Sequence, residues 1–284
     1  MARLAPLLGE GLGDCLPDAL AALERAAEAD ALEGAEEGAE GPADLADGLA
    51  GALAAAVAAQ RTYGAGAGAV ARRLADRLLV RAEKRLAEQR PADPGFSHGD
   101  AGIGWALLRH AAASQEAGAP DAAYARTGAA LLRAALDEAL RRPTDLGWHT
   151  GLAGTALAAA DVLGADLPPA GLDRCAALSG APFESPDLSL HHGALGSLEL
   201  LGVLAGQGHE GARAALGHRA GEVLGRLEDH GHRCGTPDHV PSPGFLTGLS
   251  GIGYALLRLG FPEAVPSVLL FEPDRHLCTA ARQH

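Results

Sequence analysis

A turn bounded by two glycines recurs five times along this chain, at long and regular intervals. The second glycine follows the first by three residues, and the intervals between successive turns run from 42 to 55 residues. Such a period indicates one supersecondary unit used repeatedly. We therefore expect functional residues where the turns converge. The first glycines of the turns are Gly48, Gly99, Gly151, Gly193 and Gly248.

The segments between the turns favour α-helix, because alanine and leucine dominate and β-branched residues are sparse. Segments that directly follow a turn are apolar nearly all round, which predicts buried inner helices at 103–113, 155–164, 197–206 and 252–260. Segments with charged residues on one side predict outer helices at 69–89, 123–142 and 211–230. This alternation predicts an all-α fold, an α/α toroid with a ring of inner helices inside a ring of outer ones.

The composition excludes several classes of function. A formal net charge of −13 makes nucleic acid and anionic membranes poor partners. No apolar run is long enough for a membrane span, and Glu10 and Asp14 come too early for a signal peptide. The four cysteines are scattered without Cys-x-x-Cys pairing, which predicts free thiols and a cytoplasmic protein.

Four of the 12 histidines lie in or directly before the turns, namely His98, His149, His191 and His192. If the turns converge, their imidazoles also converge, and such a cluster is typical of zinc or a similar divalent metal. A single histidine in a turn is more often a helix cap or a core residue than a metal ligand. The other eight histidines are expected at the surface or in loops: His110, His209, His218, His230, His232, His239, His276 and His284.

Two aspartates precede the first turn. Asp44 and Asp47 fit N-capping of the following helix, whereas a carboxylate that points inward would be a candidate general base. The sequence leaves both interpretations open. Trp105 and Trp148 are predicted to belong to the core.

Three motifs resemble the lanthionine synthetase C-like (LanC-like) cyclases, in particular the C-terminal cyclase domain of class II (LanM-type) lanthipeptide synthetases. They are GFSHGDAGIGWALL at 95–108, SLHHGALGSLELL at 189–201 and CGTPDHVPSPGFLTGLSGIGYALLRLGFPEAVPSVLLFEP at 234–273. The resemblance implies an α/α toroid that adds peptide cysteine thiols to dehydroalanine or dehydrobutyrine, giving thioether rings. It also implies bound zinc (Zn2+), which lowers the pKa of the thiol.

Site residues follow from the resemblance position by position. Asp44 and His98 match the family's catalytic aspartate and histidine, and His192 matches its zinc histidine. His149 and His191 stand where the family carries two zinc cysteines. The chain thus replaces a Cys, Cys, His ligand set with the candidate metal ligands His149, His191 and His192.

The resemblance also implies partners. The substrate would be a ribosomally made, dehydrated precursor peptide, and a separate dehydratase would supply it, because the family's large dehydratase domain is missing here. Five turns fall short of the family's seven helical units, so the ring is expected to be incomplete at its N-terminus. We expect residues 1–40 to form a helical segment that closes part of the ring, and residues 41–284 to form the cyclase domain.

Three functions remain open at this point. The first is a zinc-dependent cyclase, favoured by Asp44 and His98. The second is a catalytically degenerate, non-enzymatic relative that binds a precursor peptide or a partner synthetase, favoured by the loss of both zinc cysteines. A toroid glycoside hydrolase fits the architecture, but such enzymes need paired carboxylates, and the turns offer histidine instead.

Overall fold

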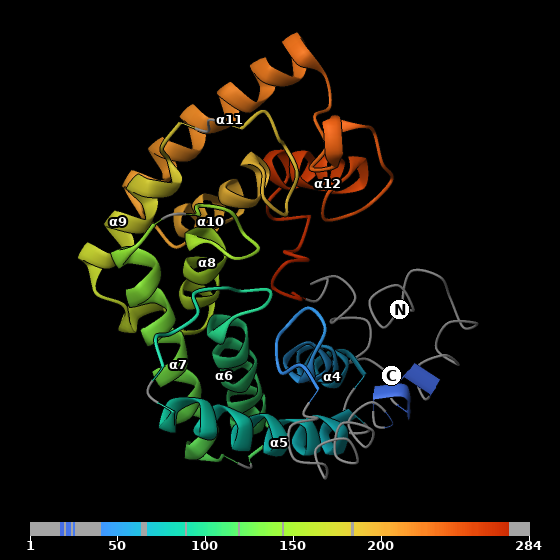
Figure 1. Ribbon diagram of the computed structural model, residues 1–284, viewed down its shortest axis with the longest axis vertical. Helices are drawn as coiled ribbons and strands as arrows, with labels where there is room; N and C mark the ends of the chain where they lie inside the picture. The colour runs from blue at the N-terminus through green and yellow to red at the C-terminus, as the bar shows by residue number, and fades with distance from the viewer. Residues whose placement is uncertain are drawn as a thin grey trace. The chain divides into compact units, whose positions relative to one another are not determined.

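The computed structural model describes residues 18, 19, 21–23, 25, 41–63, 67–88, 90–118, 120–143, 145–182 and 185–272. All regular secondary structure in these residues is helical, without strands (Figure 1). This confirms the all-α fold. The predicted segment 1–40 lies almost entirely outside the described residues. No helix in the part of the chain described here has the length and apolar character to span a membrane.

The chain divides into two compact units. The first contains the described residues up to Arg90, residues 102–131 and the described residues from Val268 onward. The second contains residues 91–101 and 132–267. The first glycines of four turns belong to the second unit, whereas Gly48 and the second glycine of the next turn, Gly102, belong to the first.

In the first unit, helix α4 (Leu49–Tyr63) packs against α5 (Gly68–Ala87). The buried side of α5 carries Val70, Ala71, Leu74, Ala75, Leu78 and Ala82, and its other side is charged, as an outer helix requires. The unit also contains most of α6 (Asp100–Glu116) and the first half of α7 (Ala122–Arg141). Here α7 approaches α6 so closely that a Cβ on Gly128 would lie 2.8 Å from the carbonyl oxygen of Gly104.

In the second unit, α8 (Leu152–Val162) packs against α10 (Ala194–Gly206). Both are apolar nearly all round, and the nine consecutive residues 152–160 of α8 are buried. The amphipathic α11 (Glu210–His230) lies against α10, and the short α9 (Pro169–Ser179) contacts α8, α10 and α11. The alternation of inner and outer helices along the chain is therefore the one expected for an α/α toroid.

Helix α12 (Leu249–Gly260) follows the last turn and differs from the other inner helices. Its Leu249 and Leu257 are 39% and 55% exposed. The prediction of a fully buried inner helix thus holds for α8 and α10 but only for one side of α12. The short helix α9 was not predicted.

His110 corrects a second expectation. It was predicted at the surface or in a loop, but it lies on α6 with only 2% of its surface exposed. The ring packs edge-on against Tyr124 at 4.8 Å between centroids, and its Nε2 lies 3.3 Å from Ser114 Oγ. His110 lies three residues after the buried Leu107, on the same side of the helix.

The five turns share one backbone hydrogen bond, which confirms that a single unit is repeated. In each, the amide after the first glycine donates to the carbonyl oxygen seven residues earlier. The second glycine is required by packing, because a Cβ on Gly154 would lie 1.8 Å from the carbonyl oxygen of Trp148. The shared bonds are Leu49–Pro42 at 3.2 Å, Asp100–Asp93 at 2.9 Å, Leu152–Asp145 at 2.9 Å, Ala194–Asp187 at 3.1 Å and Leu249–Ser242 at 2.7 Å.

Backbone hydrogen bonds within the second unit also join four of the turns to one another. The amide of Ser97 donates to the carbonyl of His149 at 3.0 Å. The amide of His149 donates to the carbonyl of His191 at 3.1 Å, and that of His191 to the carbonyl of Leu246 at 3.0 Å. We call these three bonds the turn ladder. It brings the four turns together, as the sequence predicted.

Candidate metal centre

The turn ladder places four histidines at two adjacent positions of the repeat. His149 and His191 lie two residues before the first glycine of their turns, and His98 and His192 lie directly before it. The ring centroids of His149 and His191 are 3.8 Å apart, and those of His191 and His192 are 4.1 Å apart. His98 lies 4.7 Å from His149. The predicted convergence of the imidazoles is therefore present within the second unit.

Three of these side chains form a group that fits a metal ion. His149, His191 and His192 each offer one ring nitrogen, and the three nitrogens lie within 4.8 Å of one another. A tetrahedral zinc with Zn–N bonds of about 2.0–2.1 Å holds its nitrogens about 3.4 Å apart. Binding of zinc would therefore shorten nitrogen spacings of up to 4.8 Å toward that value.

The hydrogen bonding of the rings supports the same fit. The Nδ1 atoms of His149 and His191 are buried and have no hydrogen-bond partner. A buried polar atom left without a partner is costly, and native proteins seldom keep one without a reason. His149 is only 9% exposed, whereas His192 is exposed. The group of three imidazoles is therefore open at His192.

Burial and mutual repulsion keep the inner two rings neutral. The pKa of His149 is lowered to about 4, mainly by burial and then by the neighbouring imidazoles of His191, His192 and His98. The pKa of His191 is also lowered, mainly by burial and then by His192. Metal ligation requires the neutral ring, so both side chains are in the ligand form at neutral pH.

The two predicted catalytic residues have different surroundings. His98 is exposed and belongs to the turn beside His149. Asp44 belongs to the first unit, where its Oδ1 accepts a hydrogen bond from the amide of Asp47 at 2.8 Å. That contact lies in the turn before α4, which begins at Leu49, so it does not cap the helix, and the catalytic role of Asp44 stays a prediction.

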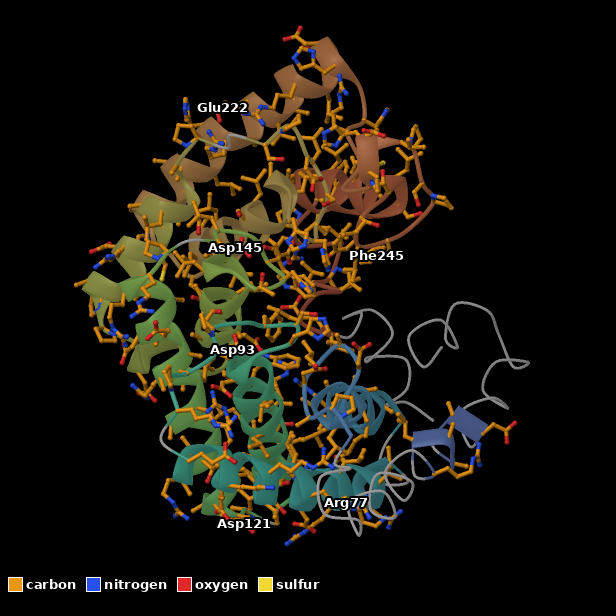
Figure 2. The ribbon with its side chains drawn as sticks, in the orientation of Figure 1. Arg77, Asp93, Asp121, Asp145, Glu222 and Phe245 are labelled. Atoms are coloured by element: carbon orange, nitrogen blue, oxygen red, sulfur yellow. The ribbon has the colours of Figure 1, made fainter. Side chains whose placement is uncertain are left out.

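Sequence reasoning missed two carboxylates in the same turns. Asp145 accepts hydrogen bonds from the Gly147 amide at 2.7 Å and the Thr150 hydroxyl at 2.5 Å. Asp187 is equivalent to it in the next repeat. A signal was available, because aspartate stands six residues before the first glycine in three of the five turns. Figure 2 shows two of the three, Asp93 and Asp145, on the loops that precede α6 and α8.

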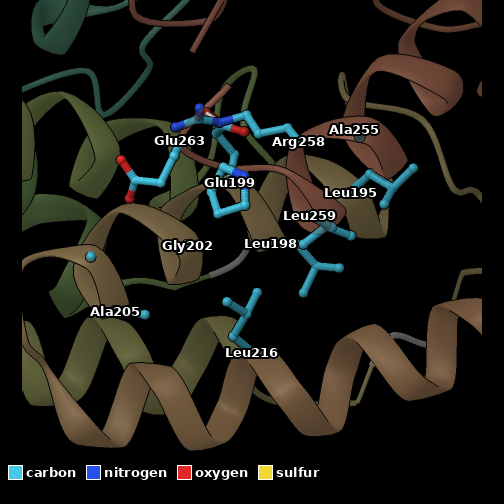
Figure 3. A pocket seen from close by; sticks show the side chains of 12 residues that line it. Leu195, Leu198, Glu199, Gly202, Ala205, Leu216, Ala255, Arg258, Leu259 and Glu263 are labelled. Carbon is cyan, nitrogen blue, oxygen red and sulfur yellow. Dashed lines mark hydrogen bonds and ion pairs between the residues drawn. The ribbon is translucent and has the colours of Figure 1, made fainter. Parts of the chain in front are cut away.

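A cavity of about 180 Å³ lies in the second unit between α10, α11 and α12 (Figure 3). Its lining is mostly apolar, and on one wall the Nε of Arg258 lies 2.7 Å from Oε1 of the buried Glu199. No histidine or cysteine lines it. The cavity therefore lacks the residues that the predicted chemistry needs.

The described cysteines are not alternative ligands or nucleophiles at this site. Cys175 and Cys234 are free and buried, which agrees with the predicted free thiols. Burial raises the pKa of Cys175 to about 11, so its thiolate is scarce at neutral pH. Cys15 and Cys278 lie outside the described residues.

The family comparison adds to this geometry. A family model described as lanthionine synthetase C-like protein matches residues 12–270. The chain belongs to the lanthionine synthetase C-like family. A search of the curated proteins gave no match. Membership in the lanthionine synthetase C-like family agrees with the helical repeat and indicates a cyclase-like function. Closeness to the class II cyclase domain and the boundary at residue 40 stay predictions.

Proposed function

We propose that this protein is a zinc-dependent cyclase of the lanthionine synthetase C-like family. It would add cysteine thiols of a dehydrated precursor peptide to dehydroalanine or dehydrobutyrine, forming thioether rings. The observation that carries the proposal is the convergence of His149, His191 and His192, two of which have buried Nδ1 atoms without a partner.

Each site residue has a role in this proposal. His149, His191 and His192 would hold the zinc, which lowers the pKa of a substrate thiol when bound. Asp44 would accept the thiol proton. As the new S–C bond forms at the β-carbon of the dehydro residue, His98 would donate the proton that the α-carbon takes up. The exposed His192 marks the side from which a peptide reaches the site.

The three-histidine ligand set is also expected to slow the addition of the thiol. Two thiolates neutralise a zinc ion, whereas three neutral imidazoles leave its charge of +2. A more positive zinc holds a substrate thiolate more tightly and makes it a weaker nucleophile. The alternative function follows from this point: a non-enzymatic relative that binds a precursor peptide or a partner synthetase.

Zinc content tests the metal site. We expect about one zinc per chain in the protein purified without a metal-binding tag, because a structural or catalytic zinc is bound as one ion by three or four ligands. His192→Ala should lose it, measured by inductively coupled plasma mass spectrometry. His218→Ala, at an exposed position on α11, is the matched control and should keep the zinc. Equal zinc content in all three proteins would contradict the proposed ligands.

A thiol assay separates the two functions. Zinc-loaded protein is incubated with a dehydrated peptide, and the remaining peptide thiols are alkylated and counted by mass spectrometry. Loss of alkylatable thiol supports the cyclase, and His98→Gln and Asp44→Asn should each slow that loss by about 10²-fold or more. Peptide binding without loss of thiol at any zinc concentration would favour the non-enzymatic relative.

A further inference from the structure

A carboxylate occupies the same place in both turns that carry His149 and His191. Asp145 and Asp187 each lie six residues before the first glycine, and each main-chain carbonyl accepts the shared hydrogen bond of the turn. The position of both residues relative to their histidines is therefore fixed by the backbone. Histidine at the ligand position is thus paired twice with aspartate four residues earlier.

Each of the two carboxylates is held by its own turn. Asp187 is 7% exposed, and it accepts hydrogen bonds from the amide of Ser189 at 2.7 Å and the hydroxyl of Ser189 at 3.1 Å. Asp145 is held by the amide of Gly147 and the hydroxyl of Thr150. Each turn therefore fixes the position of its carboxylate relative to the histidine that follows it.

Both carboxylates lie close to the chain that carries the imidazoles. A Cβ on Gly147 would lie 3.1 Å from Oδ1 of Asp145 and 3.4 Å from Cα of His192, so the Asp145 carboxylate lies beside the His191–His192 pair. Asp187 belongs to the turn that carries this pair. The Nδ1 atoms of His149 and His191 have no hydrogen-bond partner, so neither carboxylate is hydrogen-bonded to them.

We infer that Asp145 and Asp187 are positioning residues that supply the negative charge missing from a zinc site made of three neutral imidazoles. Two carboxylates balance the +2 charge that two thiolate ligands would otherwise balance. This inference rests on the proposed function, because it assumes that His149, His191 and His192 bind zinc. It concerns metal affinity and assigns neither residue a contact with substrate.

The test is the zinc dissociation constant of the full chain, measured by competition with a chromophoric chelator at fixed salt. Asp145→Asn and Asp187→Asn keep the side-chain size and remove the charge, and each should weaken binding about 10- to 100-fold. Asp93→Asn is the matched control, because the same turn position there precedes Ser97 instead of a histidine. It should change the constant less than twofold.

Two further variants separate charge from structure. Thr150→Val removes the hydroxyl that holds Asp145 but leaves the carboxylate charged, so it should weaken zinc binding much less than Asp145→Asn. Asp145→Glu keeps the charge and should recover most of the affinity. Cobalt-substituted protein gives a second readout, since its visible spectrum should keep the three-nitrogen signature in the Asn variants while the affinity falls.

The outcomes distinguish this inference from the proposed function. If the wild type binds zinc, His192→Ala does not, and both Asn variants bind like wild type, the charge role is wrong and the metal site stands. The role is also wrong if Thr150→Val or Asp93→Asn weakens binding as much as Asp145→Asn. If the wild type binds no zinc, the proposed function and this inference both fall.

Discussion

At the scale of single residues, the buried His110 makes the stability of the protein depend on pH. Burial lowers the pKa of His110, so the folded protein keeps this ring neutral, whereas in the unfolded chain its pKa is near the ordinary value of 6.5. Protonation therefore favours the unfolded state. The contribution of His110 is complete above that pH and is lost as the pH falls below it toward the lowered folded-state pKa.

We expect His110→Gln to flatten part of this dependence. The free energy of unfolding of wild type, measured by urea denaturation at pH 7.5 and pH 5.5, should fall more steeply toward acid than that of the variant. His218→Gln, at a side chain 73% exposed, should follow the wild-type dependence. If the free energy of unfolding of His110→Gln depended on pH as steeply as that of wild type, the role of His110 in this pH dependence would be contradicted.

Single residues also show what the sequence alone can predict. The four turn histidines were found because their spacing from the glycines repeats. His110 was misplaced because a polar residue in an apolar helix gives no sign of the partner that covers it, here Tyr124 from a different helix. Asp145 and Asp187 were overlooked because aspartate before a turn is ordinary turn chemistry, and its relation to the imidazoles depends on the turn ladder.

At the scale of elements, a buried ion pair joins α10 to α12. The side chains of Glu199 and Arg258 are 4% and 14% exposed. Removing one partner of such a pair costs about 3–5 kcal/mol, whereas replacing both with apolar residues is often neutral. We expect Arg258→Met to destabilise the protein by about that amount, and Glu199→Leu combined with Arg258→Met to recover most of the loss.

Urea denaturation of wild type, the single variant and the double variant measures this coupling. The single variant should have a clearly lower midpoint than the double. Equal midpoints for the two variants would show that the pair contributes nothing beyond the packing of its side chains.

The elements themselves were largely predictable. Every predicted inner and outer helix is present, because apolar residues at helical spacing and glycine at each turn are local signals. Helix α9 was missed because it is short and no glycine turn precedes it, although Pro168 and Pro169 at its start fit a first helical turn. The exposed side of α12 was also unpredicted, because the apolar pattern of a helix does not reveal which neighbours cover it.

At the scale of the whole molecule, the proposed metal should couple binding to folding. His149 and the pair His191–His192 come from turns about 40 residues apart, so zinc bound to all three would stabilise only the folded chain. Free zinc at 100 times its Kd would add about 2.7 kcal/mol. This is expected to raise Tm by several degrees.

Differential scanning fluorimetry with zinc and with a chelator measures this shift. His192→Ala should show no zinc-dependent change of Tm, and His218→Ala should respond as wild type does. A shift of equal size in His192→Ala would place the zinc elsewhere in the chain.

The turn ladder has a consequence for the evolution of such chains. Its three hydrogen bonds join main-chain atoms only, so the positions before each glycine keep their placement whichever side chains they carry. Mutation can therefore exchange a thiol for an imidazole there without rebuilding the surrounding architecture. Because the backbone fixes the geometry, single substitutions at these positions can change the metal ligands. Related proteins can therefore acquire different reactivities while they keep the same fold.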